Sequence, residues 1–307
     1  MGIKMKVAFF SETGNNQRYS RDFPNARTEV AWCLALDAPM CSLHALPDEK
    51  FDLGIVIIPK ENPKVSLDFI RRRCDKVAVM QEGPHWYFQD YSLDKQFNYY
   101  NTLMDADWVY CHNESDVNYY LGLGCKDVRV MRSLMITDGL IPRNEWGDAT
   151  MVGGNFVSWY GGFDSYMVAR EIGDPISAPS MGRKQDQEDA IEDINYLPYL
   201  SWREWINCLS QYNIGVHLMR THAAGTFAMN CGFHSIPCIG YKGLDTQEFL
   251  HPLTTIEVGD LDEAKKIGKK LKESEKFYNL CSETTRKRFE QAYTEEAWKT
   301  NWRATNK

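Results

Sequence analysis

The chain has 307 residues, more than one hydrophobic core usually organises, so two domains of roughly 150 residues each are expected. Hydrophobic residues make up 43% of the sequence and charged residues 25%, which is typical of a globular protein. The formal net charge is −7 and no long basic run exists. This charge counts against a protein that binds nucleic acid mainly by neutralising many phosphates, and leaves only a local patch for such a partner.

The nine cysteines are scattered without a C-x-x-C pair. Their odd number and spacing predict reduced, mostly buried thiols rather than a disulfide framework or a zinc site. The opening MGIKMKVAFFSETG is typical of a strand rather than a signal peptide, and no apolar run approaches a membrane span. We expect a monomer in the cytoplasm with no membrane partner.

The first half alternates between predicted strands and helices. Apolar runs predict strands at residues 6–10, 53–58, 76–80, 108–111 and 128–131, and helical spacing predicts helices at 28–36 and 93–104. The runs at 53–58 and 76–80 are too continuous for a half-exposed antiparallel sheet, so helices should cover both faces. The pattern predicts a Rossmann-type parallel sheet.

A second α/β alternation follows a polar break at residues 142–148. Helices are predicted at 163–172 and 202–209, strands at 151–156, 175–178, 214–219 and 236–240, and long charged helices at 261–271 and 275–293. We therefore expect an N-terminal domain at 1–146, a C-terminal domain at 147–285 and a terminal helical segment at 286–307. The terminal segment carries aromatic residues that need an apolar surface to cover.

The most informative segment is 214–241, in which a strand leads through a Thr/His/Ala/Gly loop into a helix and a further strand. A helix N-terminus has free backbone N–H groups and a positive dipole end, so it favours an anion such as a diphosphate. Gly225 and Thr226 are predicted to hold a diphosphate through their N–H groups, for which an ordinary loop from strand to helix is the alternative. The turn Gly14-Asn15-Asn16 is a second candidate contact, for which a plain tight turn is the alternative.

Acid–base chemistry is predicted in the loop after the strand at 76–80, because α/β sites gather at the carboxyl ends of strands. Glu82 is the leading candidate for the catalytic base, with His85 and Asp90 in reserve. Helix capping or pairing with an arginine is the structural alternative for Glu82. Trp86 and Tyr87 could stack on an acceptor base or sugar, although packing is the commoner use of such rings.

No metal ligands are predicted. His217, His222 and His234 lack a compact ligand spacing. The sequence Asp105-Ala106-Asp107 precedes the strand at 108–111, at the wrong end of a parallel sheet for a site, so it predicts a turn from helix to strand.

Several of these segments resemble the glycosyltransferases of the GT-B fold. The resemblance lies in Val152-Gly153-Gly154-Asn155-Phe156, in the Pro/Leu segment at 197–206 and in residues 214–239. Within that architecture residues 5–10, 14–16 and 76–85 resemble the bacteriophage enzymes that attach glucose or arabinose to hydroxymethylcytosine in DNA. The resemblance implies two Rossmann-like domains facing a central cleft, with the C-terminal helix crossing back to the N-terminal domain.

The resemblance also implies donor-binding residues in the C-terminal domain. Relatives carry two glutamates, with seven residues between them, where this chain has His222 and Asn230. They also place arginines after the Gly-Gly turn, where this chain has none. Asn230 can still bond ribose hydroxyls, and His222 a sugar hydroxyl or phosphate. The remaining candidates for donor contacts are Gly154, Asn155, Leu197 and Leu200, with Arg183, Lys184 or Arg220 as the cation that meets the diphosphate.

The function implied is transfer of a hexose, or a pentose such as arabinose, from a UDP-sugar to the hydroxymethyl group of cytosine in double-stranded phage DNA, within the host cytoplasm. No cofactor is required besides the UDP-sugar as co-substrate. Two alternatives stay open. One is a UDP-sugar-dependent transferase acting on a glycan or small molecule, and the other is a non-catalytic protein that binds a nucleotide sugar.

Overall fold

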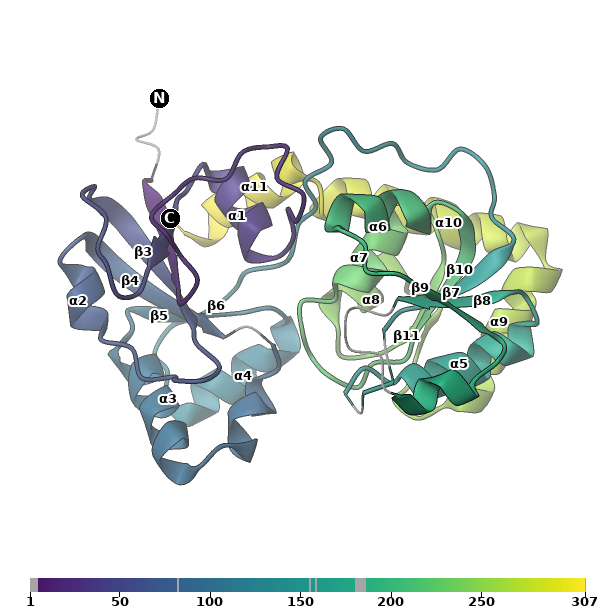
Figure 1. Ribbon diagram of the computed structural model, residues 1–307, viewed down its shortest axis with the longest axis horizontal. Helices are drawn as coiled ribbons and strands as arrows, with labels where there is room; N and C mark the ends of the chain where they lie inside the picture. Colours follow the sequence, from purple (N-terminus) through teal and green to yellow (C-terminus); the bar gives the residue numbers. More distant parts are fainter. Residues whose placement is uncertain (1–4, 82, 155, 158, 180–185, 307) are drawn as a thin grey trace. The chain divides into compact units, whose positions relative to one another are not determined.

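The chain forms two compact units (Figure 1). The computed structural model describes residues 5–81, 83–154, 156–157, 159–179 and 186–306. The first unit comprises Met1–Ile136, His222–Ala224 and Trp298–Lys307, and the second comprises Thr137–Thr221 and Gly225–Ala297.

The first unit is built on a six-stranded parallel sheet. Its strands are β1 (Val7–Ser11), β2 (Met40–Ser42), β3 (Phe51–Ile58), β4 (Cys74–Gln81), β5 (Trp108–Cys111) and β6 (Val128–Val130). Its helices are α1 (Glu29–Leu36), α2 (Leu67–Arg71), the 3-10 helix η1 (His85–Asp90), α3 (Leu93–Asp105) and α4 (Glu114–Leu123). The strand order is β2-β1-β3-β4-β5-β6, so the direction of winding reverses between β1 and β3.

Helices cover both faces of this sheet, as the continuous apolar strands predict. On β1, Phe9 stacks on Trp32 of α1, with ring centroids 6.2 Å apart. The next residue, Phe10, points to the opposite face and belongs to the buried cluster that contains Tyr99 of α3 and Tyr120 of α4. Figure 1 shows α1 on one side of the sheet and α3 and α4 on the other.

The second unit repeats this architecture. Its strands are β7 (Ala149–Val152), β8 (Ile176–Pro179), β9 (Ile194–Leu197), β10 (Tyr212–His217), β11 (Cys238–Tyr241) and β12 (Thr255–Ile256). Its helices are α5 (Gly162–Ile172), η2 (Asp186–Ala190), α6 (Trp202–Leu209), α7 (Thr226–Phe233), α8 (Asp245–Leu250), α9 (Leu261–Glu273) and α10 (Glu275–Ala292).

The second sheet has the parallel order β12-β11-β10-β7-β8-β9. The helices α5 and α9 pack on one face through Val168, Ile267 and their neighbours, and α6 and α7 pack on the other through Leu209 and Phe227. Winding reverses between β7 and β10. The carboxyl ends of these two strands therefore form a topological switch point, where open α/β sheets bind ligands.

The division of the chain falls at 136/137, ahead of the expected boundary at 146/147. The polar break belongs to the second unit because Arg143 is anchored there. Its guanidinium donates to the carbonyls of Tyr212 and Ser235, both at 2.9 Å, and to the Tyr278 hydroxyl at 2.6 Å.

The chain returns to the first unit at Trp298, later than the expected start of the terminal segment at residue 286. Helix α10 stays with the second unit, where Phe289 packs on Phe233 with centroids 5.8 Å apart. The last helix, α11 (Glu295–Thr305), joins the first unit from Trp298 onward. There the Trp298 indole donates to the Arg132 carbonyl at 2.7 Å, and Trp302 packs on Tyr110.

The nine cysteines, all within the described residues, form no disulfide, and eight of them are buried. Within the described part of the chain, none of the helices combines the length and the apolar content needed to cross a bilayer.

The second unit buries histidines in their neutral form. His251 lies 2% exposed, and its Nδ1 accepts from the Cys238 backbone N–H at 3.2 Å while Nε2 lies 2.9 Å from the Ala228 carbonyl. These partners require a proton on Nε2 and none on Nδ1. Burial lowers the pKa of His251 to about 4, and it does the same for His217 and His234.

We expect the second unit to lose stability as the pH falls from about 6.5 to about 4. In that range the unfolded chain binds protons that the folded histidines do not bind, so the free energy of unfolding falls as the pH is lowered. For His251 the difference between an ordinary pKa and one near 4 corresponds to about 3 kcal/mol. Urea unfolding at several pH values measures this slope. It should be shallower in His251→Asn and unchanged in the variant His44→Ala, in which an exposed histidine is replaced.

Candidate functional site

Two glycines at the switch point of the second sheet allow helix α7 to pack closely on the strands. An added Cβ at Gly153 would lie 2.4 Å from the ring of Phe227, and one at Gly215 would lie 3.1 Å from the same ring. The absence of side chains at these two positions lets Phe227, in the first turn of α7, lie directly on β7 and β10. The N-terminus of α7 is thereby held at the carboxyl ends of both strands.

Direct contacts pin together the segments that follow β7 and β10. The Thr221 hydroxyl donates to the Trp159 carbonyl at 2.9 Å, and the Ser165 hydroxyl accepts from the Leu218 N–H at 2.8 Å. Gly161 comes so close that an added Cβ would lie 2.0 Å from the Leu218 carbonyl oxygen. The backbone at the switch point is therefore fixed on both sides.

Helix α7 begins without a side-chain cap. Gly225 is its N-cap, with a φ of 63°, and this position makes no side-chain cap hydrogen bond. A Cβ at Gly225 would lie 1.9 Å from Thr246 Oγ1, so glycine is required for the close approach as well as for the backbone angle. Free N–H groups and the positive end of the dipole make this helix start favourable for an anion.

Three buried polar atoms around α7 have no hydrogen-bond partner within the described residues. They are His217 Nε2, Asn230 Oδ1 and Thr246 Oγ1, in side chains that are 8%, 3% and 4% exposed. His217 ends β10, where its Nε2 would lie 3.3 Å from a Cβ on Gly154, and Asn230 lies one turn along α7. Unsatisfied buried polar groups are rare and call for a ligand or a bound water.

Replacing Asn230 by alanine should weaken donor binding about tenfold, the loss expected for one hydrogen bond. The thermal stability of the free protein should change little, because the variant removes a buried acceptor that has no partner. Calorimetric titration with a UDP-sugar and a melting curve measure the two effects. Asn207→Ala, on the exposed side of α6, is the control. Unchanged donor affinity in Asn230→Ala would argue against a role for this residue in binding ribose.

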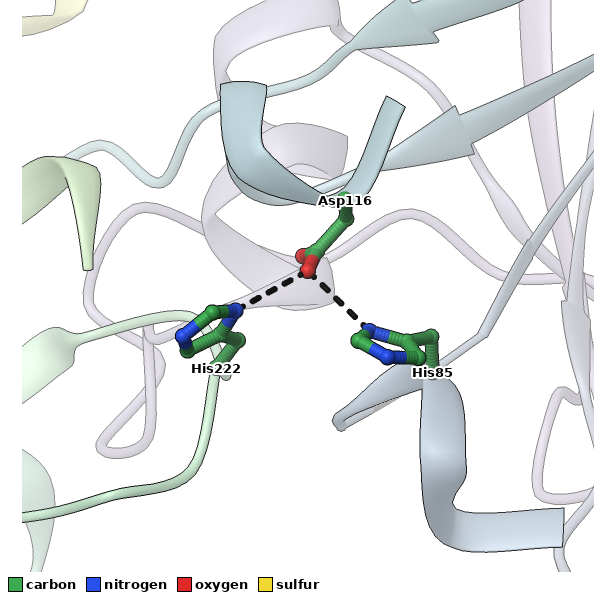
Figure 2. Close-up of side chains that lie close together, drawn as sticks. All are labelled: His85, Asp116 and His222. Atoms are coloured by element: carbon green, nitrogen blue, oxygen red, sulfur yellow. Dashed lines mark hydrogen bonds and ion pairs between the residues drawn. The ribbon is translucent and has the colours of Figure 1, made fainter. Parts of the chain in front are cut away.

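In the first unit His85, Asp116 and His222 come together (Figure 2). The Nδ1 atoms of His85 and His222 lie 3.2 Å and 3.3 Å from the same oxygen, Asp116 Oδ1. His85 follows β4, and Asp116 lies in the first turn of α4, which follows β5. Since β4 and β5 are parallel neighbours, both side chains lie at the carboxyl edge of the first sheet.

The Asp116 carboxylate is almost fully enclosed, with 5% of its side chain exposed. Burial raises its pKa, but hydrogen bonds from His222, His85 and Asn113 outweigh burial and hold the pKa of Asp116 well below its usual range. The Asn113 amide donates to Asp116 Oδ2 and to the Ala223 carbonyl, both at 3.2 Å. Asp116 is thus an ionised anchor that positions two half-buried imidazoles.

The turn Gly14-Asn15-Asn16 makes hydrogen bonds and close contacts with neighbouring parts of the first unit. Asn16 Oδ1 accepts from the Ser42 N–H at 3.0 Å, its amide donates to the Ala45 carbonyl at 3.1 Å, and a Cβ on Gly14 would lie 1.9 Å from the Cys41 carbonyl oxygen. Asn15 contacts Gln17 through its amide at 3.3 Å. These contacts match the tight-turn alternative, and a donor contact from this turn stays a prediction.

The other candidates are dispersed. Trp86 and Tyr87 are half-buried on η1, where Tyr87 packs edge-on against Tyr91 with centroids 5.7 Å apart. Leu197 ends β9, Leu200 is half-buried beyond it, and the Arg220 guanidinium pairs with Asp164 at 3.1 Å. Four predicted residues lie outside the described part of the chain: Glu82, Asn155, Arg183 and Lys184.

The D-x-D sequence has the structural role expected from its position. Asp107 accepts from the Val77 N–H at 2.9 Å and pairs with Lys76, and Asp105 pairs with Arg71. Sequence reasoning missed Asp116. The available signal was the polar run His112-Asn113-Glu114-Ser115-Asp116 directly after a buried strand, next to the strand that precedes His85.

Neither a protein-family model nor a curated protein matches this chain. Solved structures do match it. HepE of Anabaena, solved with UDP and glucose, superposes with a TM-score of 0.67 at 10% identity over 98% of this chain and 99% of its own. An alpha-glucosyltransferase in complex with UDP and a 13-mer DNA containing an HMU base gives a TM-score of 0.63 at 13% identity, over 99% of each chain.

The chain has the GT-B fold. S. aureus TarM, solved with UDP, Fondaparinux and alpha-GlcNAc-glycerol, gives a TM-score of 0.65 at 10% identity and is covered over only 56% of its length. This chain therefore spans about half of TarM but almost all of HepE and of the DNA-bound glucosyltransferase. At such low identities the likeness establishes the architecture.

Proposed function

We propose that this protein is a glycosyltransferase that uses a nucleotide sugar, with UDP as the nucleotide. The observation that carries the proposal is the switch point of the second sheet, where the uncapped start of α7 lies beside three buried polar atoms without partners. A nucleotide diphosphate offers anionic oxygens for the former and hydroxyl groups for the latter. UDP in the solved relatives HepE and TarM supports the choice of nucleotide.

Transfer requires the acceptor hydroxyl to lose its proton while the bond between the sugar carbon and the diphosphate breaks. Glu82 is proposed to take the proton, since it directly follows Gln81, the last residue of β4, in the sequence. The backbone N–H groups of Gly225 and Thr226, with Arg220 or the Arg183-Lys184 pair, are proposed to stabilise the departing diphosphate. Asn230 is proposed to bond the ribose hydroxyls.

A hydroxymethylated base in DNA is the acceptor that we favour. Its support is the resemblance of residues 5–10, 14–16 and 76–85 to the phage enzymes, together with the DNA-bound relative. Trp86 and Tyr87, half-buried on η1, would contact a base that has been turned out of the duplex.

A glycan or small molecule is the second candidate acceptor, because a net charge of −7 disfavours a large polyanion. Binding without transfer is the third candidate, since His222 and Asn230 replace the carboxylates of relatives. Incubation with radiolabelled UDP-sugars and hydroxymethylcytosine DNA separates the three. Transfer to DNA supports the first, transfer only to a saccharide or small acceptor the second, and saturable binding with neither product the third. Absence of any binding to UDP or UDP-sugars would contradict the proposal as a whole.

A further inference from the structure

We propose that His85, Asp116 and His222 form a binding site for one divalent transition-metal ion such as zinc. The two imidazoles and the carboxylate would supply three ligands, and the fourth position would be left for water or an exchangeable anion. This site is independent of the proposed sugar transfer, because metal binding can be measured in the absence of any donor or acceptor.

The spacing of the three side chains fits a tetrahedral metal ion. One nitrogen or oxygen atom from each lies within 4.8 Å of those of the other two. The two distances from the histidine Nδ1 atoms to Asp116 Oδ1 are 3.2 Å and 3.3 Å. Zinc bonds of about 2.0–2.1 Å place tetrahedral ligands about 3.3–3.4 Å apart, so the ion would need only small side-chain movements.

The types of ligand also fit. Two imidazoles and one carboxylate are a common set for a zinc ion that keeps one position open, whereas structural zinc sites usually have four protein ligands. Figure 2 shows the two rings on either side of the Asp116 carboxylate, both directed toward it. With 23% and 30% of their side chains exposed, His85 and His222 leave an ion a route from solvent.

A second layer of contacts holds the ligands in place. The Asn113 amide donates to the other carboxylate oxygen, Asp116 Oδ2, and leaves Oδ1 to the histidines. The ring of His85 lies against Tyr119 with centroids 4.2 Å apart. The segment that carries His222 is fixed at Ala223 by Asn113 and at Ala224 by the Ser133 hydroxyl. Such outer contacts orient ligands and tune their affinity for the metal.

The alternative is a pair of histidines that simply donate hydrogen bonds to Asp116. The first arrangement predicts that the protein binds a divalent metal ion, and the second predicts that it does not. A metal ion would displace the proton from the Nδ1 atom of each histidine and would itself occupy that atom, whereas Glu82 would stay the proposed catalytic base.

The test is cobalt titration of the full-length chain after treatment with a chelator and dialysis. Visible absorption should show one tetrahedral Co²⁺ per chain, without the charge-transfer band of a cysteine thiolate, and zinc should displace it. His222→Ala and Asp116→Asn should lose this spectrum. Asn113→Ala should bind zinc about 10–100-fold more weakly, and His44→Ala, which changes an exposed histidine elsewhere in the first unit, should bind as the unchanged protein does.

The proposal is overturned if the stripped protein takes up no Co²⁺ or Zn²⁺, or if His222→Ala binds as well as the unchanged protein. Circular dichroism checks that each variant is folded. Should His222→Ala fail to fold, X-ray absorption of the zinc-loaded unchanged protein decides. Nitrogen and oxygen neighbours support the site, and sulfur neighbours contradict it.

Discussion

Replacing Glu82 by glutamine is expected to lower the rate of sugar transfer by about 10²–10⁴-fold, the contribution typical of a general base. The amide has nearly the shape of the carboxylate but cannot accept the acceptor's proton. Donor affinity should stay within a few fold, because Glu82 is not among the proposed donor contacts. Steady-state kinetics should therefore show a fall in kcat, and calorimetry an unchanged Kd for the UDP-sugar.

Asp90→Asn is the matched control for this variant. Asp90 is an exposed carboxylate at the end of η1, and its replacement removes the same charge a short distance further along the sequence. Transfer by Asp90→Asn should stay within a few fold of the unchanged protein. If Glu82→Gln also keeps its activity within a few fold, the assignment of the base is wrong, and His85→Gln becomes the next variant to measure.

The sheets could be predicted from sequence because their central strands are long and continuously apolar. Phe51–Ile58 and Cys74–Gln81 each extend over eight residues. The strands that were missed are short and lie toward the sheet edges: β2 has three residues, β9 four and β12 two. Hydrophobic periodicity needs a longer window than these strands provide, so only their pairing in the fold defines them.

The local backbone of the candidate site could be predicted where neighbouring residues determine it. The glycine loop and helix start at residues 221–226 depend on backbone geometry, which the residues themselves specify. Asp116 could not be paired with His85 in the same way, because their contact depends on β4 and β5 being neighbours. A donor contact from His222 stays a prediction, and its Nδ1 lies 3.3 Å from Asp116 Oδ1 in the first unit, a contact that the sequence did not predict. Contacts between distant parts of a chain leave no periodic signal.

Replacing Gly225 by alanine is expected to weaken binding of a UDP-sugar by at least about tenfold, because one or more backbone hydrogen bonds to the diphosphate would be lost. The φ of 63° disfavours any residue with a Cβ by about 1–2 kcal/mol, and the added Cβ would lie 1.9 Å from Thr246 Oγ1. The start of α7 must move to relieve this overlap. Its N–H groups then no longer point at the place where the anion binds. Calorimetric titration measures the affinity, and a melting curve measures the accompanying loss of stability.

Gly259→Ala separates the two effects, because Gly259 has a φ of 90° in the same unit but nothing within 4 Å of an added Cβ. This control should lose stability without losing donor affinity. Adding Thr246→Ala to Gly225→Ala removes Oγ1 and leaves the nearest remaining side-chain atom, the Thr246 Cβ, at 3.0 Å. Gly225→Ala should therefore weaken donor binding less in the Thr246→Ala background than it does in the unchanged protein. If Gly225→Ala binds the donor as tightly as the unchanged protein, the anion does not lie at the start of α7, and the donor site must be sought elsewhere on the second unit.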